Sequence, residues 1–194
     1  MVPDPRTGAR SFVALYPDAA ARERLHALAT ELAREAIRAR LTIPADLHLT
    51  LAFIGELDAR AAQRVAAMLA ALDVAPFDWT LDRVGSFGAA KVVWAGGAPD
   101  PRLQTLAQRV RAGLDALGLA YDTRPLVAHV TLLRGTLQAQ PAERAIAPPI
   151  HSTAGRPVLL RSDASGGPGK ARYHPWIFDP DPGPNPGTEP EAQA

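Results

Sequence analysis

The stretch LHLTLAFI at residues 47–54 has a partner of the same pattern, LVAHVTLL at residues 126–133. Both are short apolar runs that favour strands, and both contain the order His, apolar residue, Thr, Leu, at His48–Leu51 and His129–Leu132. Side chains alternate between the two faces of a strand, so the His and Thr of each copy point one way while the apolar residues enter the buried side. If the two copies face each other, two histidines and two threonines line one cleft.

The surrounding pattern repeats as well: a strand, a helix and a histidine-bearing strand occur in this order twice. The pattern predicts strands at residues 11–16, 47–54, 77–84, 91–95, 126–133, 158–161 and 176–178, and helices that end near residue 40, begin after Asp58 and run from Pro101 to Gly118. We therefore expect an α+β fold of two pseudo-symmetric lobes, each an antiparallel sheet with helices on the outside, and a catalytic cleft between them.

Composition separates a compact part from a tail. With 194 residues, 47% of them hydrophobic, the chain can bury the core of one domain, which we place at residues 1–178. Residues 179–194 consist largely of Pro, Gly and acids, and we expect this tail to be disordered. The net charge is +1, and the tail contains acids but no base, so residues 1–178 are mildly basic. This suits an anionic substrate but falls short of the dense Lys/Arg arrays that coat nucleic acid.

Several other chemistries are excluded or disfavoured. The chain has no cysteine, which excludes disulfides, a thiol nucleophile and thiolate metal sites. It shows no His pair at the spacing of a helical zinc site, and no metal or cofactor is expected. No run approaches the roughly 18 apolar residues of a membrane span, so we expect a cytoplasmic protein that does not bind membranes. No protein partner is implied, and we expect a monomer.

Two histidines and two threonines suit the opening of a cyclic phosphodiester. This reaction needs a base that deprotonates the attacking water and an acid that protonates the departing ribose oxygen, and imidazole can do either near neutral pH. The hydroxyl groups of Thr50 and Thr131 can donate hydrogen bonds to the nonbridging phosphate oxygens. A lone HxT motif is weak evidence, because a half-buried histidine is more often structural. Two copies in a duplicated arrangement favour catalysis, and the design requires no metal.

At this point the residues show a resemblance to a known family. HLTLAFIG and RPLVAHVTLLRG resemble the paired motifs of the two-histidine phosphoesterase superfamily, most closely its RNA 2′,3′-cyclic phosphodiesterase branch, also called 2′-5′ RNA ligases. The resemblance implies that His48 is the proton donor to the leaving oxygen and His129 the acceptor from water, while Thr50 and Thr131 hold the phosphate. It also implies a 2′-phosphomonoester product, with weak reverse 2′-5′ ligation. Ala128 stands where the family often has proline.

Three further residues are candidates for substrate binding. Arg134 could bring positive charge to the phosphate, but on strict alternation it faces away from His129, so contact requires the strand to end or twist. Phe87 could stack on a base or could belong to the core. Tyr173 is a candidate by its likeness to a late tyrosine of the family.

Two rival interpretations remain open. In the first, the same fold acts on ADP-ribose cyclic phosphate or on 2′-5′-linked oligoadenylate, rather than on RNA ends or nucleotides that carry a 2′,3′-cyclic phosphate. In the second, the chain is a non-catalytic RNA-binding module. The retention of both HxT motifs counts against the second.

Overall fold

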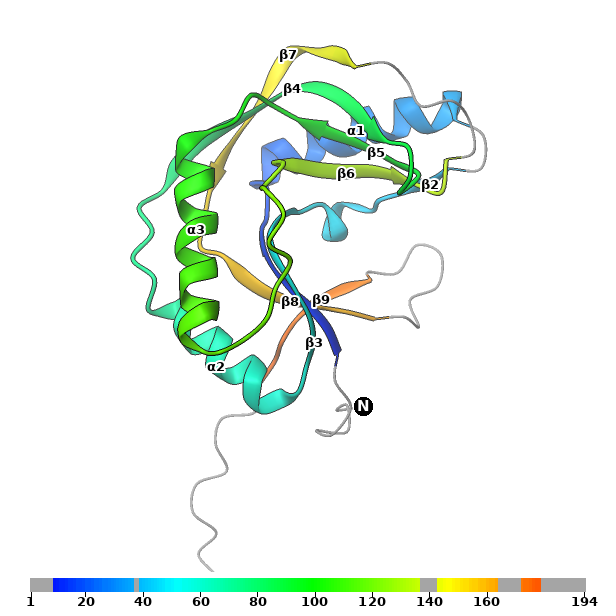
Figure 1. The fold of residues 1–194 in the computed structure, drawn as a ribbon. Coiled ribbons are helices and arrows are strands. Elements are labelled where there is room, and N and C mark those ends of the chain that lie inside the picture. Colours follow the sequence, from blue (N-terminus) through cyan, green and yellow to red (C-terminus); the bar gives the residue numbers. More distant parts are fainter. Residues whose placement is uncertain (1–8, 37–38, 137–142, 164–171, 179–194) are drawn as a thin grey trace, which may run out of the picture.

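A computed structural model describes residues 9–36, 39–136, 143–163 and 172–178 of the chain (Figure 1). The tail expected at residues 179–194 lies outside them. The described strands are β1 Ala9–Leu15, β2 Arg40–Leu41, β3 Leu49–Leu57, β4 Phe77–Phe87, β5 Val92–Gly96, β6 His129–Arg134, β7 Arg144–Ala154, β8 Val158–Ser162 and β9 Tyr173–Pro175. The helices are α1 Ala19–Glu35, α2 Ala59–Ala70 and α3 Pro101–Ala116, together with a short 3-10 turn at Pro44–Asp46.

All the described strands belong to one curved sheet with the order β7-β4-β5-β6-β3-β1-β8-β9, and β2 pairs with β6 beside this path. Each recorded strand pair is antiparallel. Four strands of this path lie on each side of the β6–β3 contact, where Leu49 pairs with Val130. The expected α+β class and its two halves are therefore confirmed, with both halves joined in a single sheet.

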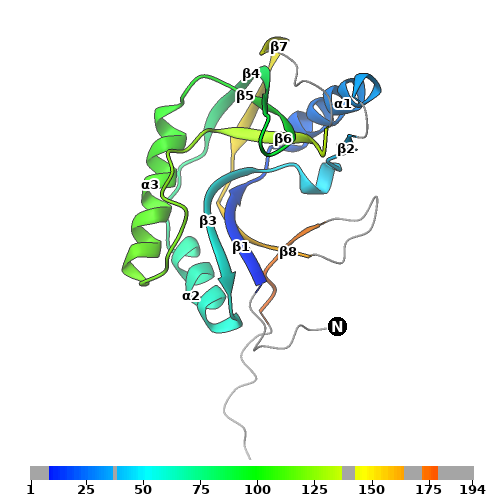
Figure 2. The same cartoon turned by 45° about the vertical axis from the view of Figure 1, so that its right-hand side comes forward.

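The helices lie on the outer side of this sheet (Figures 1 and 2). Helix α1 packs against β6 and β7, whereas α3 packs against β3, and α2 packs against β8 and α3. Each helix of the repeated strand–helix–strand unit thus covers the histidine strand of the other half. None of the helices in the described ranges is long and apolar enough to span a membrane.

The core lies between the helices and the sheet. Its fully buried side chains include Leu15, Leu25, Leu49, Leu51, Leu114, Leu132 and Ile150. Burying one such side chain stabilises the fold by roughly 1.5–3 kcal/mol. Because Leu49, Leu51 and Leu132 come from the two motifs, the same strands that carry the histidines also anchor the core.

Local signals predicted most helix ends well. Asp58 caps α2 by accepting a hydrogen bond from the Ala61 amide at 2.7 Å. Pro101 begins α3, and Gly118, at φ +67°, follows its end in the left-handed conformation that favours glycine. The helix expected to reach about residue 40 ends earlier, at Glu35, because Arg40–Leu41 form β2 against β6.

Three strand predictions need correction. Strand β7 was not predicted, because Pro148 and Pro149 are uncommon within strands. A register shift opposite Leu81–Arg83 leaves both prolines, which lack an amide hydrogen, unpaired in the ladder. The strand expected at residues 176–178 lies instead at Tyr173–Pro175, where it pairs with β8. The turn expected at residues 85–88 comes later, since β4 continues to Phe87.

Asp18 links the first half of the chain to β7. Its carboxylate accepts hydrogen bonds from the amides of Ala21 and Thr153, both at 2.9 Å, and its own amide donates to the Ser152 hydroxyl at 3.0 Å. These hydrogen bonds, the one from Ala21 first, lower the pKa of Asp18. The same side chain thus caps α1 and holds the sheet edge against it.

We predict that Asp18→Ala destabilises the protein more than Asp58→Ala, which removes a helix cap alone. A lost cap costs about 1 kcal/mol, and the additional bond of the Asp18 carboxylate to β7 adds about 1.5 kcal/mol. Urea unfolding of both variants measures the difference. Because the pKa of Asp18 is lowered in the folded state, its contribution is present above the unfolded pKa near 4 and disappears as pH falls through the folded pKa. Equal unfolding free energies of the two variants would contradict the dual role.

Candidate active site

The register between β3 and β6 gathers the four motif residues. Leu49 pairs with Val130, and both side chains are fully buried on the helix side of the sheet. In an antiparallel ladder the flanking residues are also neighbours, so His48 lies across from Thr131, and Thr50 lies across from His129. The structure therefore brings together the four residues that the sequence singled out. We call the sheet face that carries them the site face.

Both imidazole rings are held in the same way. Nδ1 of His48 lies 2.7 Å from the carbonyl oxygen of Asp46, and Nδ1 of His129 lies 2.7 Å from the carbonyl oxygen of Val127. A carbonyl oxygen can only accept, so in each ring Nδ1 carries the hydrogen and donates it. This leaves Nε2 of both histidines for proton transfer.

The surroundings of both histidines disfavour the protonated imidazole in the free protein. His48 is 8% exposed, and burial lowers its pKa to about 4; the Asp46 carbonyl opposes this shift, while the charges of Arg134 and His129 add to it. Burial, with a contribution from Arg134, also lowers the pKa of His129. The coupling of both rings to Arg134, and of His48 to His129, indicates that the three side chains lie close together.

The position of Arg134 depends on a β-bulge. Trp94 of β5 pairs with Thr131, but Val93 pairs with Leu133, so Leu132 is an extra residue in β6. After such a bulge the alternation of side chains is reversed. Arg134, opposite Val92, therefore returns to the site face that Thr131 occupies. Strict alternation predicts that Arg134 faces away from His129. The bulge at Leu132 explains why Arg134 lies on the same face as His129 instead.

Aromatic rings flank each histidine. Phe12 and Tyr173 each lie 4.9 Å from the His48 ring, centre to centre, with Tyr173 edge-on. On the other side, Phe87 lies 4.9 Å from His129 and packs edge-on against it. These contacts place both aromatic candidates at the histidines and remove water from one side of each ring.

Trp94 completes the surroundings of His129, at 6.3 Å between ring centres. Its indole crosses Gly85 of β4, where a Cβ atom would come within 2.3 Å of the ring. Glycine at this position therefore leaves the room in which the indole lies. The sequence places Trp94 only in the strand expected at residues 91–95, and a lone Trp in an apolar strand gives no sign of which face it occupies.

Asp46 is a site residue that sequence reasoning missed. Its carboxylate is buried and accepts hydrogen bonds from the backbone amides of Arg172, at 3.0 Å to each oxygen, and Tyr173, at 3.2 Å. Its backbone carbonyl meanwhile accepts from His48. One residue thus fixes both the imidazole and the strand that carries the Tyr173 ring. An acid two positions before the motif is visible in the sequence, but its partners lie over 120 residues further along the chain.

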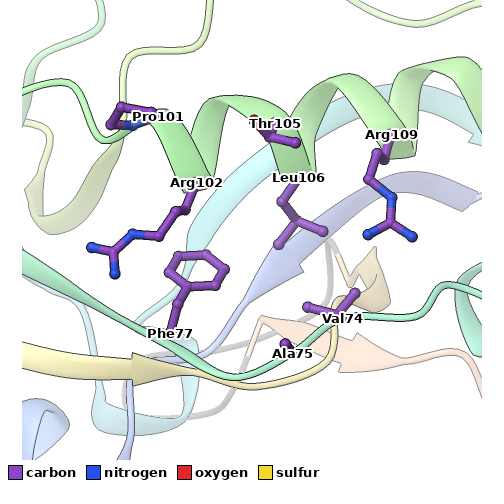
Figure 3. A pocket seen from close by; sticks show the side chains of 8 residues that line it. All are labelled: Val74, Ala75, Phe77, Pro101, Arg102, Thr105, Leu106 and Arg109. Atoms are coloured by element: carbon purple, nitrogen blue, oxygen red, sulfur yellow. The ribbon is translucent and has the colours of Figure 1, made fainter.

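Other features of the described surface lie away from this site. A hollow of about 250 Å³ between α3 and the start of β4 is lined by residues that include Phe77, Arg102 and Arg109 (Figure 3). Its arginines are already engaged, since Arg102 binds Asp100 and Arg109 donates to the Asp73 carbonyl. Within the ranges that the structure describes, no group of three or more His, Cys, Asp or Glu residues is arranged to hold a metal ion.

Comparison with known proteins agrees with the motifs and the fold. The family described as LigT-like phosphoesterase matches residues 15–94. The RNA 2′,3′-cyclic phosphodiesterase of Escherichia coli K12 is 36% identical over 133 residues, which cover 67% of this chain and 74% of that protein. The protein of the same name from Archaeoglobus fulgidus is 32% identical over 128 residues, covering 64% of this chain and 72% of that one.

The fold is shared too. A crystal structure of Escherichia coli LigT complexed with 3′-AMP superposes with a TM-score of 0.73 at 27% identity, covering 88% of this chain and 96% of that one. These matches confirm the resemblance carried by the two motifs. This chain belongs to the LigT-like phosphoesterase family.

Proposed function

We propose that this protein hydrolyses the 2′,3′-cyclic phosphate at the end of RNA, or of a nucleotide, to a 2′-phosphomonoester, with weak reverse 2′-5′ ligation. The observation that carries the proposal is the pair of histidines from the two halves of the sheet, each with Nδ1 bound to a carbonyl and Nε2 left for chemistry. The names of the relatives support the substrate class. The crystal structure of Escherichia coli LigT in complex with 3′-AMP supports a site that accepts nucleotides.

In the proposed reaction, Nε2 of His129 removes a proton from water, and the water oxygen attacks phosphorus. The bond from phosphorus to the ribose O3′ breaks, and the proton on Nε2 of His48 passes to O3′. Thr50, Thr131 and Arg134 donate hydrogen bonds to the nonbridging oxygens, where negative charge increases in the transition state. Each proton transfer contributes roughly a hundred- to ten-thousand-fold in rate, and no step uses a metal ion.

His48 must be protonated to act as the acid, which its low pKa opposes in the free protein. With a pKa of about 4, His48 carries the proton in roughly one molecule in a thousand at pH 7. A bound phosphate brings negative charge beside Arg134 and both imidazoles, and an opposite charge raises the pKa of a histidine. Substrate binding and the protonation of His48 are therefore coupled in this proposal.

We predict that His48→Ala and His129→Ala each lower turnover of an RNA oligonucleotide with a 2′,3′-cyclic phosphate end by at least about a hundred-fold. His151→Ala, an exposed histidine on β7, is the matched control and should retain full activity. Chromatographic separation of 2′- and 3′-phosphate products gives the rate and the regiochemistry, with and without a chelator.

The same assay separates the rival functions. ADP-ribose cyclic phosphate and 2′-5′-linked oligoadenylate are run beside the RNA substrate, and faster turnover of either would reassign the substrate. Binding of RNA without turnover would show a non-catalytic module. Near-parent rates in either histidine variant would overturn the roles assigned here.

We also predict a bell-shaped dependence of kcat/KM on pH, with both limbs below 6.5, because the pKa values of both histidines are lowered in the free protein. In Arg134→Gln a positive charge is lost, so both limbs should move to higher pH while the rate falls. Arg124→Gln, which removes an exposed arginine paired with Asp122, should leave the limbs in place. Limbs that stay fixed in Arg134→Gln would contradict the assigned electrostatics.

Asp46 should act as a positioning residue. In Asp46→Asn an amide NH₂ replaces one acceptor oxygen and meets the backbone amides of Arg172 and Tyr173, which costs about 1–3 kcal/mol of stability. We expect kcat to fall about ten-fold or more with little change in KM, because the imidazole and Tyr173 lose their alignment. Asp18→Ala serves as a control that is destabilised at a distance from the site. Equal kcat values for the two variants would leave Asp46 with a structural role only.

A further inference from the structure

The two halves of the sheet place a different residue at the same position after each histidine. In β3, Val13 pairs with Ala52 but Ala14 pairs with Thr50, so Leu51 is an extra residue, as Leu132 is in β6. The bulge reverses the alternation in both strands. The fifth residue after each histidine, Phe53 in β3 and Arg134 in β6, therefore returns to the site face.

The register confirms the face on which Phe53 lies. Phe53 pairs with Phe12 of β1, and cross-strand partners project from the same face of a sheet. The Phe12 ring contacts both His48 and Tyr173. Phe12 itself is buried, whereas Phe53 is 36% exposed and is one of three large hydrophobic side chains that are exposed in the described part of the chain.

A cation accompanies the exposed ring. The guanidinium carbon of Arg10 lies 5.4 Å from the centre of the Phe53 ring, in cation–π geometry. Arg10 is the cross-strand partner of Glu56, so an acidic residue accompanies this cation on the same pair of strands. A phosphate is therefore a poor ligand here, while the flat face of a nucleobase suits an aromatic ring with an adjacent guanidinium.

We infer that Phe53 and Arg10 form a stacking site for a base of the RNA, namely the base of the nucleotide that precedes the one carrying the cyclic phosphate. This inference rests on the proposed function. The Phe12 ring fills the space beside His48, so Phe53 lies one side chain further from the phosphorus atom. Phe53 pairs with Phe12 and Thr50 pairs with Ala14, so strand geometry places the two Cα atoms about 7 Å apart along the strand. The terminal nucleotide is held at the histidines, and the next nucleotide reaches the Phe53 ring.

The test compares a dinucleotide that ends in a 2′,3′-cyclic phosphate with the matching mononucleotide 2′,3′-cyclic phosphate. Phe53→Ala should lower kcat/KM for the dinucleotide by about 5- to 150-fold, equivalent to about 1–3 kcal/mol of stacking, through a higher KM. Turnover of the mononucleotide should change by less than about two-fold. Phe53→Trp should retain the preference for the dinucleotide, since the indole also stacks.

Ile177→Ala, which truncates another exposed apolar side chain, is the matched control and should affect neither substrate. Equal losses on both substrates in Phe53→Ala, or no loss on either, would overturn the inference. Thermal unfolding of each variant shows whether a loss of activity reflects a loss of folded protein. Failure of the parent protein to turn over either substrate would instead refute the proposed function, so the two failures are distinguishable.

Discussion

The contact between β3 and β6 is the constraint on which the site depends. Leu49 and Val130 pair at the centre of the sheet, with four strands on each side, and both side chains are fully buried. Their apolar side chains hold the two halves together, and their flanking residues are the histidines and threonines. A shift of this register by one residue would turn the polar side chains toward the core, so the hydrophobic effect that stabilises the fold also aligns the chemistry.

Burial at this contact also determines the charge state of the site. Taking the imidazoles partly out of water lowers the pKa of both, and Arg134 lowers them further. The site thus combines the Arg134 cation with two imidazoles whose protonated forms are disfavoured, and a nearby anion would reverse this effect. A phosphate both neutralises Arg134 and favours the protonated imidazole.

Local sequence patterns were sufficient for what local physics determines. The cap at Asp58, the proline start of α3, and the strand character around His48 and His129 all follow from residues near in sequence. The bulge at Leu132 could not be predicted, because it depends on the register with β5. The link from Asp46 to Tyr173 requires the closing of a long loop, and β7 was hidden by prolines that only the partner strand excludes from the ladder. Each miss involves a partner distant in sequence.

The two halves repeat the same order of strand, helix and histidine strand but differ in the side chains around each histidine. Backbone geometry is shared: each histidine donates to the carbonyl two residues earlier, and each strand carries a bulge at the third residue after the histidine. Side chains at equivalent positions differ, with Asp46 matched by the exposed Val127 and Phe53 matched by Arg134. The residue whose carbonyl holds His48 is therefore the buried Asp46, whereas the one whose carbonyl holds His129 is the exposed Val127. The different surroundings of the two rings support the proposed division of roles, in which one imidazole serves as acid and the other as base.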